Sequence, residues 1–389
     1  MTQTGGRIDS LDALRGFAIL GILLINIQVF SGWGFVALET RQALTWSEWD
    51  QSIGVWLDTL VRTKFFSLFS LLFGYSFMML AQKIEQGPVR YHLRRMLGLL
   101  VIGTVHSLLF SPWDILMLYA VMGVFLGAFL NARPGALVIW AFGLLLAVGV
   151  ALWLGPQLGL PAGRGELALR LLQENVPALS GSSYFEVIRA NAYLSVSVLM
   201  DRLEGLRPLR VLAMFLLGAA AARLHLAESN TGHIKLLAAV AAAGLGAGVA
   251  LAMAGAGVQT ETTTGRFIAI AEDVASPPLL AMGYGAILLL WWRGNGIFTR
   301  GVRSAFAPVG RMAMTNYVLQ SAVCISIFYG FGGGRFATIS LAGLMLFSVV
   351  LFMTQMIVSA IWLRLFNYGP LEWLWRWQVK GKRPHLLKK

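Results

Sequence analysis

LRGFAILGILLINIQVFSGW, residues 14–33, is a run of twenty residues that carries a single charge, Arg15, near its start. A transmembrane helix needs about 20 mainly apolar residues, so this run is long enough to cross a bilayer. Asp9 and Asp12 precede the run and no small-residue cleavage site follows it, which favours a retained helix over a removed signal peptide. We therefore expect the chain to enter a membrane with its first helix.

Nine further apolar runs follow the first one. We expect spans near 65–80, 97–110, 115–130, 137–154, 209–224, 236–256, 277–292, 312–331 and 339–363. The composition agrees, because 57% of the 389 residues are hydrophobic, 13% are charged and the mean hydropathy is +0.70, whereas soluble domains are far more polar. The sequence thus predicts an all-α polytopic membrane helix bundle with about ten transmembrane helices, forming a single integral membrane domain over 1–389.

The distribution of charge sets the expected orientation. With the N-terminus inside, the predicted cytoplasmic segments hold 20 of the 31 basic residues but only 5 of the 18 acidic ones, which gives +15 inside and −2 outside. Basic residues concentrate on the cytoplasmic side of membrane proteins, so we expect both termini inside and a location in the bacterial cytoplasmic (inner) membrane. Spans one to five then occupy 1–155, spans six to ten 209–364, and a basic cytoplasmic tail 365–389.

Two outer segments are too long to be simple turns. Residues 47–63 place Trp49, Ile53 and Trp56 on one helical face, which is the pattern of an interfacial helix that lies in the membrane surface. Residues 156–208 are expected to form an outer helical cap. Its predicted helices lie near 166–175 and 183–203.

Several classes of function are disfavoured by what the chain lacks. Its single cysteine, Cys324, lies in an apolar run, so the chain can build neither an internal disulfide nor a cysteine metal site. No glycine-rich nucleotide loop occurs, and the basic tail 380–389 favours anionic lipid over nucleic acid. No carboxylate lies near the middle of a predicted span, which argues against a proton-coupled transporter. We expect no metal and no nucleic-acid partner.

His106 is the one histidine inside a predicted span, because the other four lie in cytoplasmic loops or at their edges. Histidine transfers protons near neutral pH, and ionisable groups inside a membrane are rare and usually functional. His106 is therefore a candidate general base, with a hydrogen bond that joins two helices as an equally weighted alternative. Asp114 follows at the outer turn after the third span, where it either caps the next helix or contributes to a site.

Amide side chains inside the spans are further candidates. Asn26 lies at a depth in the first span similar to that of His106. Asn316 and Gln320 are four residues apart in the ninth span and so share one face of a helix. Such amides often only join helices, and we give that role about half the weight. The candidates for lining a central cavity are Gln28, Asp114, Asn316, Tyr317 and Gln320.

Arg15 and Arg311 begin the first and ninth spans at the expected cytoplasmic edge. At that depth an arginine either reaches toward lipid phosphates or binds the phosphates of a cosubstrate such as acetyl-CoA or another acyl-CoA. Contact with lipid is the more common role of a single arginine at a membrane edge. Arg15 and Arg311 are nonetheless the candidate residues for binding a phosphorylated donor.

Five motifs are spread over nearly the whole chain. They are LDALRGF at 11–17 with NIQ at 26–28, SLFSLLFG at 67–74, DILMLYA at 114–120, GRMAMTNYVLQS at 310–321 and GPLEWLWR at 369–376. Together they resemble the YeiB-like family of bacterial polytopic membrane proteins, a family largely of unknown function. The resemblance implies the fold and the membrane location rather than an activity.

The first span is also similar to that of the wider transmembrane acyltransferase group, which includes the O-acetylating membrane acyltransferases and heparan-α-glucosaminide N-acetyltransferase. In the O-acetylating branch a histidine follows the Arg-Gly start, and Asn26 stands at the corresponding place here. The heparan enzyme similarly has an asparagine there and an essential histidine in the next outer loop. Residues 31–64 contain no histidine. The resemblance therefore implies acyl transfer with Asn26 in the site and His106 as the remaining source of an imidazole.

The resulting hypothesis is an integral membrane acyltransferase that moves an acyl group, acetyl among the candidates, from cytoplasmic acyl-CoA to an acceptor reached from the outer side. Asn26 would stabilise the reacting carbonyl and His106 would act as general base, or less favourably as nucleophile. The expected partners are membrane lipids and a small-molecule, glycan or lipid acceptor, with a homodimer left open. The alternatives are a transporter or lipid-binding membrane protein without catalysis, and a scaffold without a small-molecule site.

Overall fold

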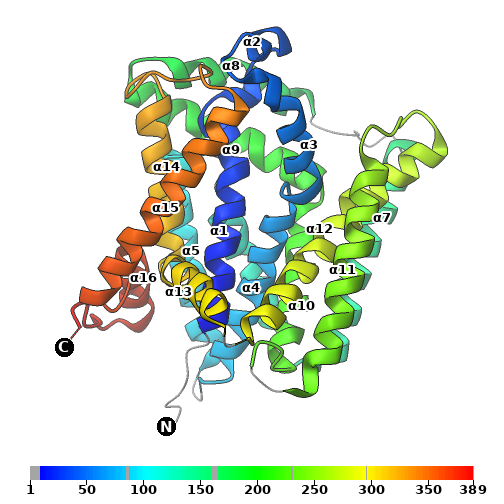
Figure 1. Ribbon diagram of the computed structural model, residues 1–389, viewed down its shortest axis with the longest axis vertical. Coiled ribbons are helices and arrows are strands. Elements are labelled where there is room, and N and C mark those ends of the chain that lie inside the picture. The colour runs from blue at the N-terminus through cyan, green and yellow to red at the C-terminus, as the bar shows by residue number, and fades with distance from the viewer. Residues whose placement is uncertain (1–8, 85–86, 159–164, 229–230, 295, 389) are drawn as a thin grey trace.

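The computed structural model describes residues 9–84, 87–158, 165–228, 231–294 and 296–388. Within these ranges the chain is helical and contains no β-strand, apart from one isolated bridge between Phe366 and Leu387. The helices pack side by side into an elongated bundle (Figure 1). The predicted all-α membrane helix bundle is thereby confirmed.

Each of the ten apolar runs coincides with a helix. The helices at these runs are α1 (Asp9–Phe30), α4 (Lys64–Ala81), α5 (Pro88–Leu109), α6 (Leu116–Leu126), α7 (Pro134–Leu154), α10 (Arg207–Arg223), α11 (Ile234–Gly255), α12 (Thr263–Trp292), α14 (Ala313–Phe328) and α15 (Leu341–Leu365). Short connecting elements are η1 (Trp33–Phe35), α2 (Leu38–Gln42), η2 (Ser47–Trp49), η3 (Gly127–Phe129), η4 (Gly155–Leu158), η5 (Val176–Ser180) and η6 (Thr231–His233).

Fewer than ten helices are complete spans when they are judged by length and apolarity alone. In the described parts of the chain six helical stretches are long and apolar enough to cross a membrane. A seventh is counted if α9 (Tyr184–Glu204) and α10, which are bent by 69° relative to each other, together form one span. The stretch at 47–81 joins α3 to α4, while α6 and α14 are apolar but short. Arg94 and Arg95 make the first half of α5 polar. The multi-pass membrane class is therefore shown, and the count of ten stays a prediction.

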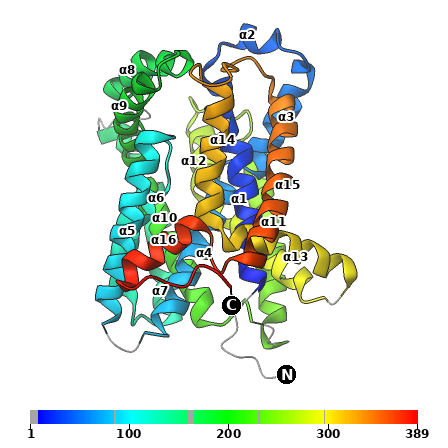
Figure 2. The same cartoon turned by 90° about the vertical axis from the view of Figure 1, so that its left-hand side faces the viewer.

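The start of α1 and the C-terminal helix α16 lie toward the same end of the bundle (Figures 1 and 2). This arrangement agrees with an even number of crossings. The charge split predicts that this end is cytoplasmic.

Reporter fusions test that orientation. Fusions at Gly87, Arg133 and the C-terminus should report a cytoplasmic location, and a fusion at Gly181 an external one, because the basic loops stay inside. Alkaline phosphatase and a fluorescent protein that matures only in the cytoplasm give opposite signals at each site. A cytoplasmic signal at Gly181 would overturn the assignment.

Helices form in the outer segment where they are expected. They are α8 (Glu166–Asn175) and α9 (Tyr184–Glu204), which pack against each other. Ser183 accepts a hydrogen bond from the backbone N–H of Glu186 and so caps the start of α9. The pair covers the end of the bundle away from the start of α1, above α5 (Figure 2).

The segment 47–63 is helical and packs against the bundle. It forms η2 and α3 (Asp50–Leu60), and Figure 1 shows α3 running steeply along the bundle. Leu57 is fully buried, because α3 packs against α11 and α15, whereas Trp49 and Trp56 are exposed. The Asp50 carboxylate also accepts a hydrogen bond from the Ala342 N–H at 3.1 Å. Contacts with two helices thus hold α3 against the bundle, and its expected orientation parallel to the membrane surface stays a prediction.

Two helices lie outside the predicted spans. One is α13 (Ile297–Arg311), which is amphipathic and crosses the end of the bundle beside α1. The other is α16 (Pro370–Lys380), which lies within the predicted basic tail and packs against α5 and α14. Beyond α16 the chain returns to α15, where the Lys388 N–H donates to the Leu365 carbonyl at 2.9 Å. The tail is thus docked on the bundle.

Paired glycines allow α4 and α10 to cross closely. A methyl group built on Gly218 would lie 1.8 Å from the Leu71 carbonyl oxygen, and one built on Gly74 would lie 2.0 Å from that of Phe215. Small residues at a crossing let two membrane helices pack backbone against backbone.

Gly218→Ala should therefore lower the thermal midpoint of the protein in detergent, at a cost of about 1–3 kcal/mol for the forced separation of the helices. Gly246→Ala on α11 is the matched control, because a methyl group there meets nothing within 4 Å. Equal midpoints for the two variants would contradict the close crossing. Fluorescence-detected size exclusion after heating measures both.

Candidate functional site

The site begins at the last turn of α5. The helix starts nine residues before the apolar run and includes His92, which is buried with its Nε2 at 2.6 Å from the Gly123 carbonyl oxygen. His106 consequently lies close to the C-terminal end of α5 and is only 1% exposed. Its Nδ1 lies 2.8 Å from Oδ1 of Asp114, which is equally buried. The structure thus joins two residues that sequence reasoning proposed separately.

Asp114 has two partners, one for each oxygen. Its Oδ2 accepts a hydrogen bond from the Met117 N–H at 2.8 Å and so caps the start of α6. An ionised carboxylate only accepts hydrogen bonds, so beside ionised Asp114 the Nδ1 of His106 is the donor, and in the neutral ring Nε2 is then an acceptor. The capping and site roles considered for Asp114 are therefore combined in one side chain.

The partner of Nε2 is Ser321, on α14. Its hydroxyl lies 2.9 Å from Nε2 of His106, and the side chain is fully buried. Sequence reasoning did not select Ser321. The available signal was its position four residues after Tyr317, on the same face of the helix. The described residues therefore contain a continuous hydrogen-bonded series from Asp114 through His106 to Ser321.

Tyr317 lies against the histidine. The two ring centroids are 5.0 Å apart, and the tyrosine hydroxyl accepts a hydrogen bond from the Ile115 N–H at 3.4 Å. Phe110 stacks near the other side of the imidazole, with ring centroids 5.9 Å apart. These aromatic rings exclude water from the imidazole and fix its plane.

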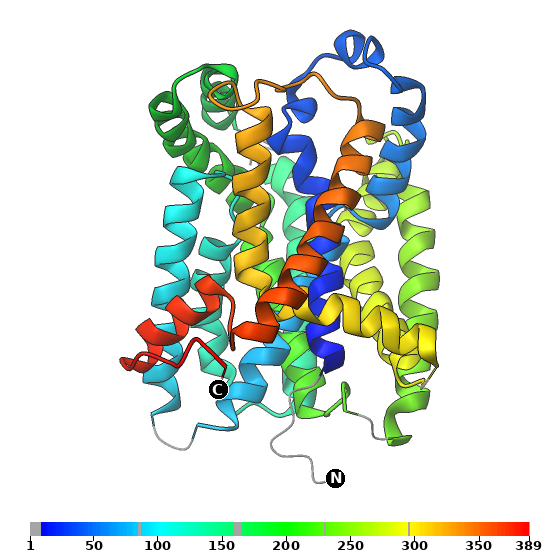
Figure 3. The same cartoon turned by 60° about the vertical axis from the view of Figure 1, so that its left-hand side comes forward.

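Asn316 and Gln320 join helices. The Asn316 side chain donates to Ser359 Oγ at 2.9 Å, and Gln320 donates to Gln355 Oε1 at 2.9 Å. Both partners belong to α15, which lies beside α14 in front of α1 (Figure 3). Among the described residues neither amide borders the cavity that Tyr317 reaches. The contacts of Asn316 and Gln320 are therefore those of side chains that join two helices.

Asn26 and Gln28 lie on α1, away from the contacts of His106. Gln28 is buried and accepts a hydrogen bond from Arg62 at 3.2 Å. Asn26 is partly buried, and both ring nitrogens of His106 have other partners. The main neighbours of α1 are α4, α13 and α14, whereas α5 packs against α6, α9 and α16. The structure therefore brings His106 together with Asp114 and Tyr317, and it does not join Asn26 to them.

A cavity of about 320 Å³ reaches Tyr317 from the end of the bundle where α1 starts. Its far wall contains Ile115, Tyr119 and Tyr317. Four arginines line its other end. They are Arg15, Arg95, Arg311 and Arg376.

The arginine end of the cavity is built by helix termini. Arg15 is paired with Asp12 and donates to Ser76 at 2.6 Å, while Arg311 is the last residue of α13. Glu372 of α16 accepts hydrogen bonds from the Met314 and Thr315 N–H groups at the start of α14, at 2.7 and 3.1 Å. Burial raises the pKa of the Glu372 carboxyl, and these hydrogen bonds oppose that rise. This end of the cavity thus combines four arginines with two carboxyl groups, those of Asp12 and Glu372, and its net charge is positive.

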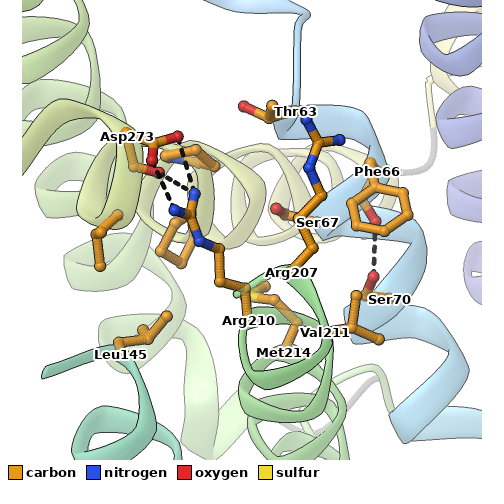
Figure 4. A pocket seen from close by; sticks show the side chains of 13 residues that line it. Thr63, Phe66, Ser67, Ser70, Leu145, Arg207, Arg210, Val211, Met214 and Asp273 are labelled. Carbon is orange, nitrogen blue, oxygen red and sulfur yellow. Dashed lines mark hydrogen bonds and ion pairs between the residues drawn. The ribbon is translucent and has the colours of Figure 1, made fainter. Parts of the chain in front are cut away.

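Two further pockets lie beyond Tyr119. The Tyr119 hydroxyl is 2.7 Å from Ser70 Oγ, and Ser70 borders a small pocket of about 60 Å³ with Arg210 and Asp273. Figure 4 shows Arg210 and Asp273 facing each other there, paired at 2.6 and 2.8 Å. Both also line a larger pocket of about 750 Å³ near the cap. The contact between Tyr119 and Ser70 thus lies between the cavity that Tyr317 lines and these two pockets.

No group of three or more histidine, cysteine or carboxylate side chains that could hold a metal ion occurs in the part of the chain that the structure describes. The side chains that form this site supply imidazole, carboxylate, hydroxyl and guanidinium groups.

Comparison with known proteins identifies the family. Residues 221–382 match the family described as protein of unknown function (DUF418). The chain is 32% identical to the uncharacterized protein YxaH of Bacillus subtilis, covering 98% of each chain, and 30% identical to the uncharacterized protein YeiB of Escherichia coli, covering 94% of each. No solved structure matches. The chain therefore belongs to the YeiB-like DUF418 family of bacterial membrane proteins, as the sequence motifs indicated.

Proposed function

We propose that this protein is an acyltransferase of the bacterial cytoplasmic membrane, which moves an acyl group such as acetyl from cytoplasmic acyl-CoA to an acceptor reached from the outer side. One observation carries the proposal. A buried histidine, oriented by a carboxylate, lies behind Tyr317 at the end of a cavity whose other end carries four arginines. A basic entrance followed by a proton-transfer group suits a donor with phosphates at one end and a thioester at the other.

The arginine end would bind the donor. Guanidinium groups form charge-assisted hydrogen bonds with phosphates. Arg15 belongs to α1 and Arg311 to α13, and these two helices pack against each other. Leu72, Phe73 and Tyr119 add apolar and aromatic walls to the cavity, which suit the uncharged arm of coenzyme A.

His106 would act as the base for transfer. Asp114 keeps the proton on Nδ1 and leaves Nε2 as an acceptor, which is the form a general base requires. The role of Asn26, an amide that stabilises the reacting carbonyl, stays part of the proposal from the family resemblance.

Turnover of acetyl-CoA tests this function. The purified protein in detergent or nanodiscs should release free CoA from acetyl-CoA, measured with a thiol reagent. A preparation with His106→Ala supplies the background. No CoA release above that background, over a panel of acyl lengths and with bacterial lipid added as acceptor, would refute the activity.

Arg311→Ala should raise the KM for acyl-CoA by about tenfold or more and change kcat little, because it removes charge-assisted hydrogen bonds to the donor phosphates. Arg300→Ala is the matched control, since Arg300 is an exposed arginine of the same helix outside the cavity. Initial rates over a range of donor concentrations measure both. A fall in kcat alone for Arg311→Ala would argue against phosphate binding there.

One observation favours a transporter as the second candidate. Hollow regions lie on both sides of Tyr119, whose ring contacts Phe66, Phe73 and Phe215 with centroids 5.2 to 5.7 Å apart. An aromatic barrier between two cavities is what alternating access requires. A transporter would leave acetyl-CoA intact, so the same CoA-release assay separates the two functions.

A further inference from the structure

We propose that Ser321 is the nucleophile of this site and that transfer passes through an acyl ester on its hydroxyl. This inference rests on the proposed acyl transfer. It follows from the order of the three side chains. Asp114 bonds to Nδ1 of His106 and Ser321 to Nε2, at 2.8 and 2.9 Å, which is the arrangement that activates a serine in hydrolases of unrelated folds.

The position of the protons supports this role. Because Nδ1 donates to Asp114, Nε2 has a free lone pair directed at the Ser321 hydroxyl. A base within hydrogen-bond distance of a hydroxyl, itself oriented by a third group, is the signature of an activated nucleophile. All three side chains are at most 1% exposed, so water does not compete with the acyl donor for the hydroxyl.

Comparison with other serines in the bundle shows that Ser321 is unusual. Ser70, Ser326 and Ser348 donate to the backbone carbonyl four residues earlier at 2.8 to 2.9 Å, as serines in membrane helices commonly do. The corresponding contact of Ser321, to the Tyr317 carbonyl, is longer at 3.4 Å. The Ser321 hydroxyl is thus oriented toward His106 rather than toward its own helix.

Both half-reactions balance with these side chains, the donor and the acceptor. The Ser321 oxygen attacks the thioester carbonyl and its proton passes to Nε2 of His106. The carbon–sulfur bond then breaks, and the proton on Nε2 goes to the departing CoA sulfur. In the second half the acceptor attacks the ester carbonyl and gives its proton to Nε2 of His106. The bond between the acyl carbon and the Ser321 oxygen then breaks, and the proton on Nε2 returns to that oxygen.

A covalent intermediate also suits a membrane site. Donor and acceptor can bind in turn, so the cavity never has to hold both. The Tyr317 ring stands between the cavity and the Ser321–His106 pair, since Tyr317 lines the cavity whereas Ser321 does not. Rotation of this ring admits the thioester.

Trapping the intermediate tests the proposal. The full-length protein is mixed with acetyl-CoA without acceptor, quenched in acid and analysed by intact mass and by mass spectrometry of its proteolytic peptides. We expect a mass gain of one acetyl group on the peptide that contains residues 313–328, absent in Ser321→Ala and retained in Ser326→Ala, the control on the same helix. Ser321→Ala should also lose at least about 10²-fold in acetyl-CoA turnover.

A cysteine variant keeps the test decisive if the alanine variant folds poorly. Ser321→Cys should trap the acyl group as a thioester that neutral hydroxylamine removes, whereas the ester of the unaltered protein needs alkaline hydroxylamine. Full turnover in Ser321→Ala with loss in His106→Ala would overturn the nucleophile but leave general-base acyl transfer standing. Absence of turnover in the unaltered protein would instead refute the proposed function itself.

Discussion

His106→Ala should reduce acyl transfer by on the order of 10²-fold or more, because it removes the imidazole that is positioned to take a proton from Ser321 and, in the proposed reaction, from the acceptor. It should leave expression and the elution profile in detergent close to those of the parent. The readout is CoA release at saturating acetyl-CoA, so that donor binding does not obscure the loss.

His225→Ala is the control for this variant, since His225 is exposed and pairs only with Glu228 among the described residues. His106→Gln adds a second comparison, because its amide retains hydrogen-bonding capacity between Asp114 and Ser321 but cannot act as a base at neutral pH. Recovery of turnover in His106→Gln would mean that the histidine only joins helices.

Asp114→Asn should cost between about 10² and 10⁴ in turnover although its shape is unchanged. The asparagine can still accept from the Met117 N–H, but its amide group then faces Nδ1 of His106 and donates to it. The ring proton is thereby moved to Nε2, which can no longer accept from Ser321. CoA release and thermal midpoint are measured together, and we expect only the first to change strongly.

Asp50→Asn provides the matched comparison for Asp114→Asn. Asp50 also accepts a backbone hydrogen bond at a helix start, from Ala342, and lies far from any histidine in the sequence. A similar loss of turnover in both variants would indicate that the effect of Asp114→Asn comes from the weakened helix cap. Intact activity in Asp114→Asn would show that the tautomer of His106 is irrelevant.

The sequence predicted the positions of the apolar helices well, because bilayer thickness sets a length that apolar runs reveal directly. It located the end of α5 to within one residue but missed nine residues at its start. Arg94 and Arg95 interrupt the apolar run there, and a charged helix turn resembles a loop in composition. The amphipathic helices α13 and α16 were missed for the same reason, since they lie along one end of the bundle and need only one apolar face.

The site was only partly predictable. His106 and Asp114 are eight residues apart, so a turn between two helices brings them together. Ser321 is 215 residues from His106, and its contact depends on how α14 packs beside α5 and α6. Spacing within a sequence carries no information on such a contact. Asn316 and Gln320 were candidates for lining a cavity because they are polar residues inside a span. Polarity alone does not tell whether such a side chain faces a cavity or a neighbouring helix, and here both contact α15.

The contact between Glu372 and the start of α14 has a consequence for biosynthesis. The N–H groups of Met314 and Thr315 need an acceptor, and that acceptor lies 57 or 58 residues further along the chain. The ribosome therefore delivers α14 to the membrane well before the carboxylate that satisfies it. A protein truncated before α16 would insert all its apolar helices and still leave the helix that bears Ser321 without its cap. Assembly of this helix therefore ends only after α16 has been synthesised.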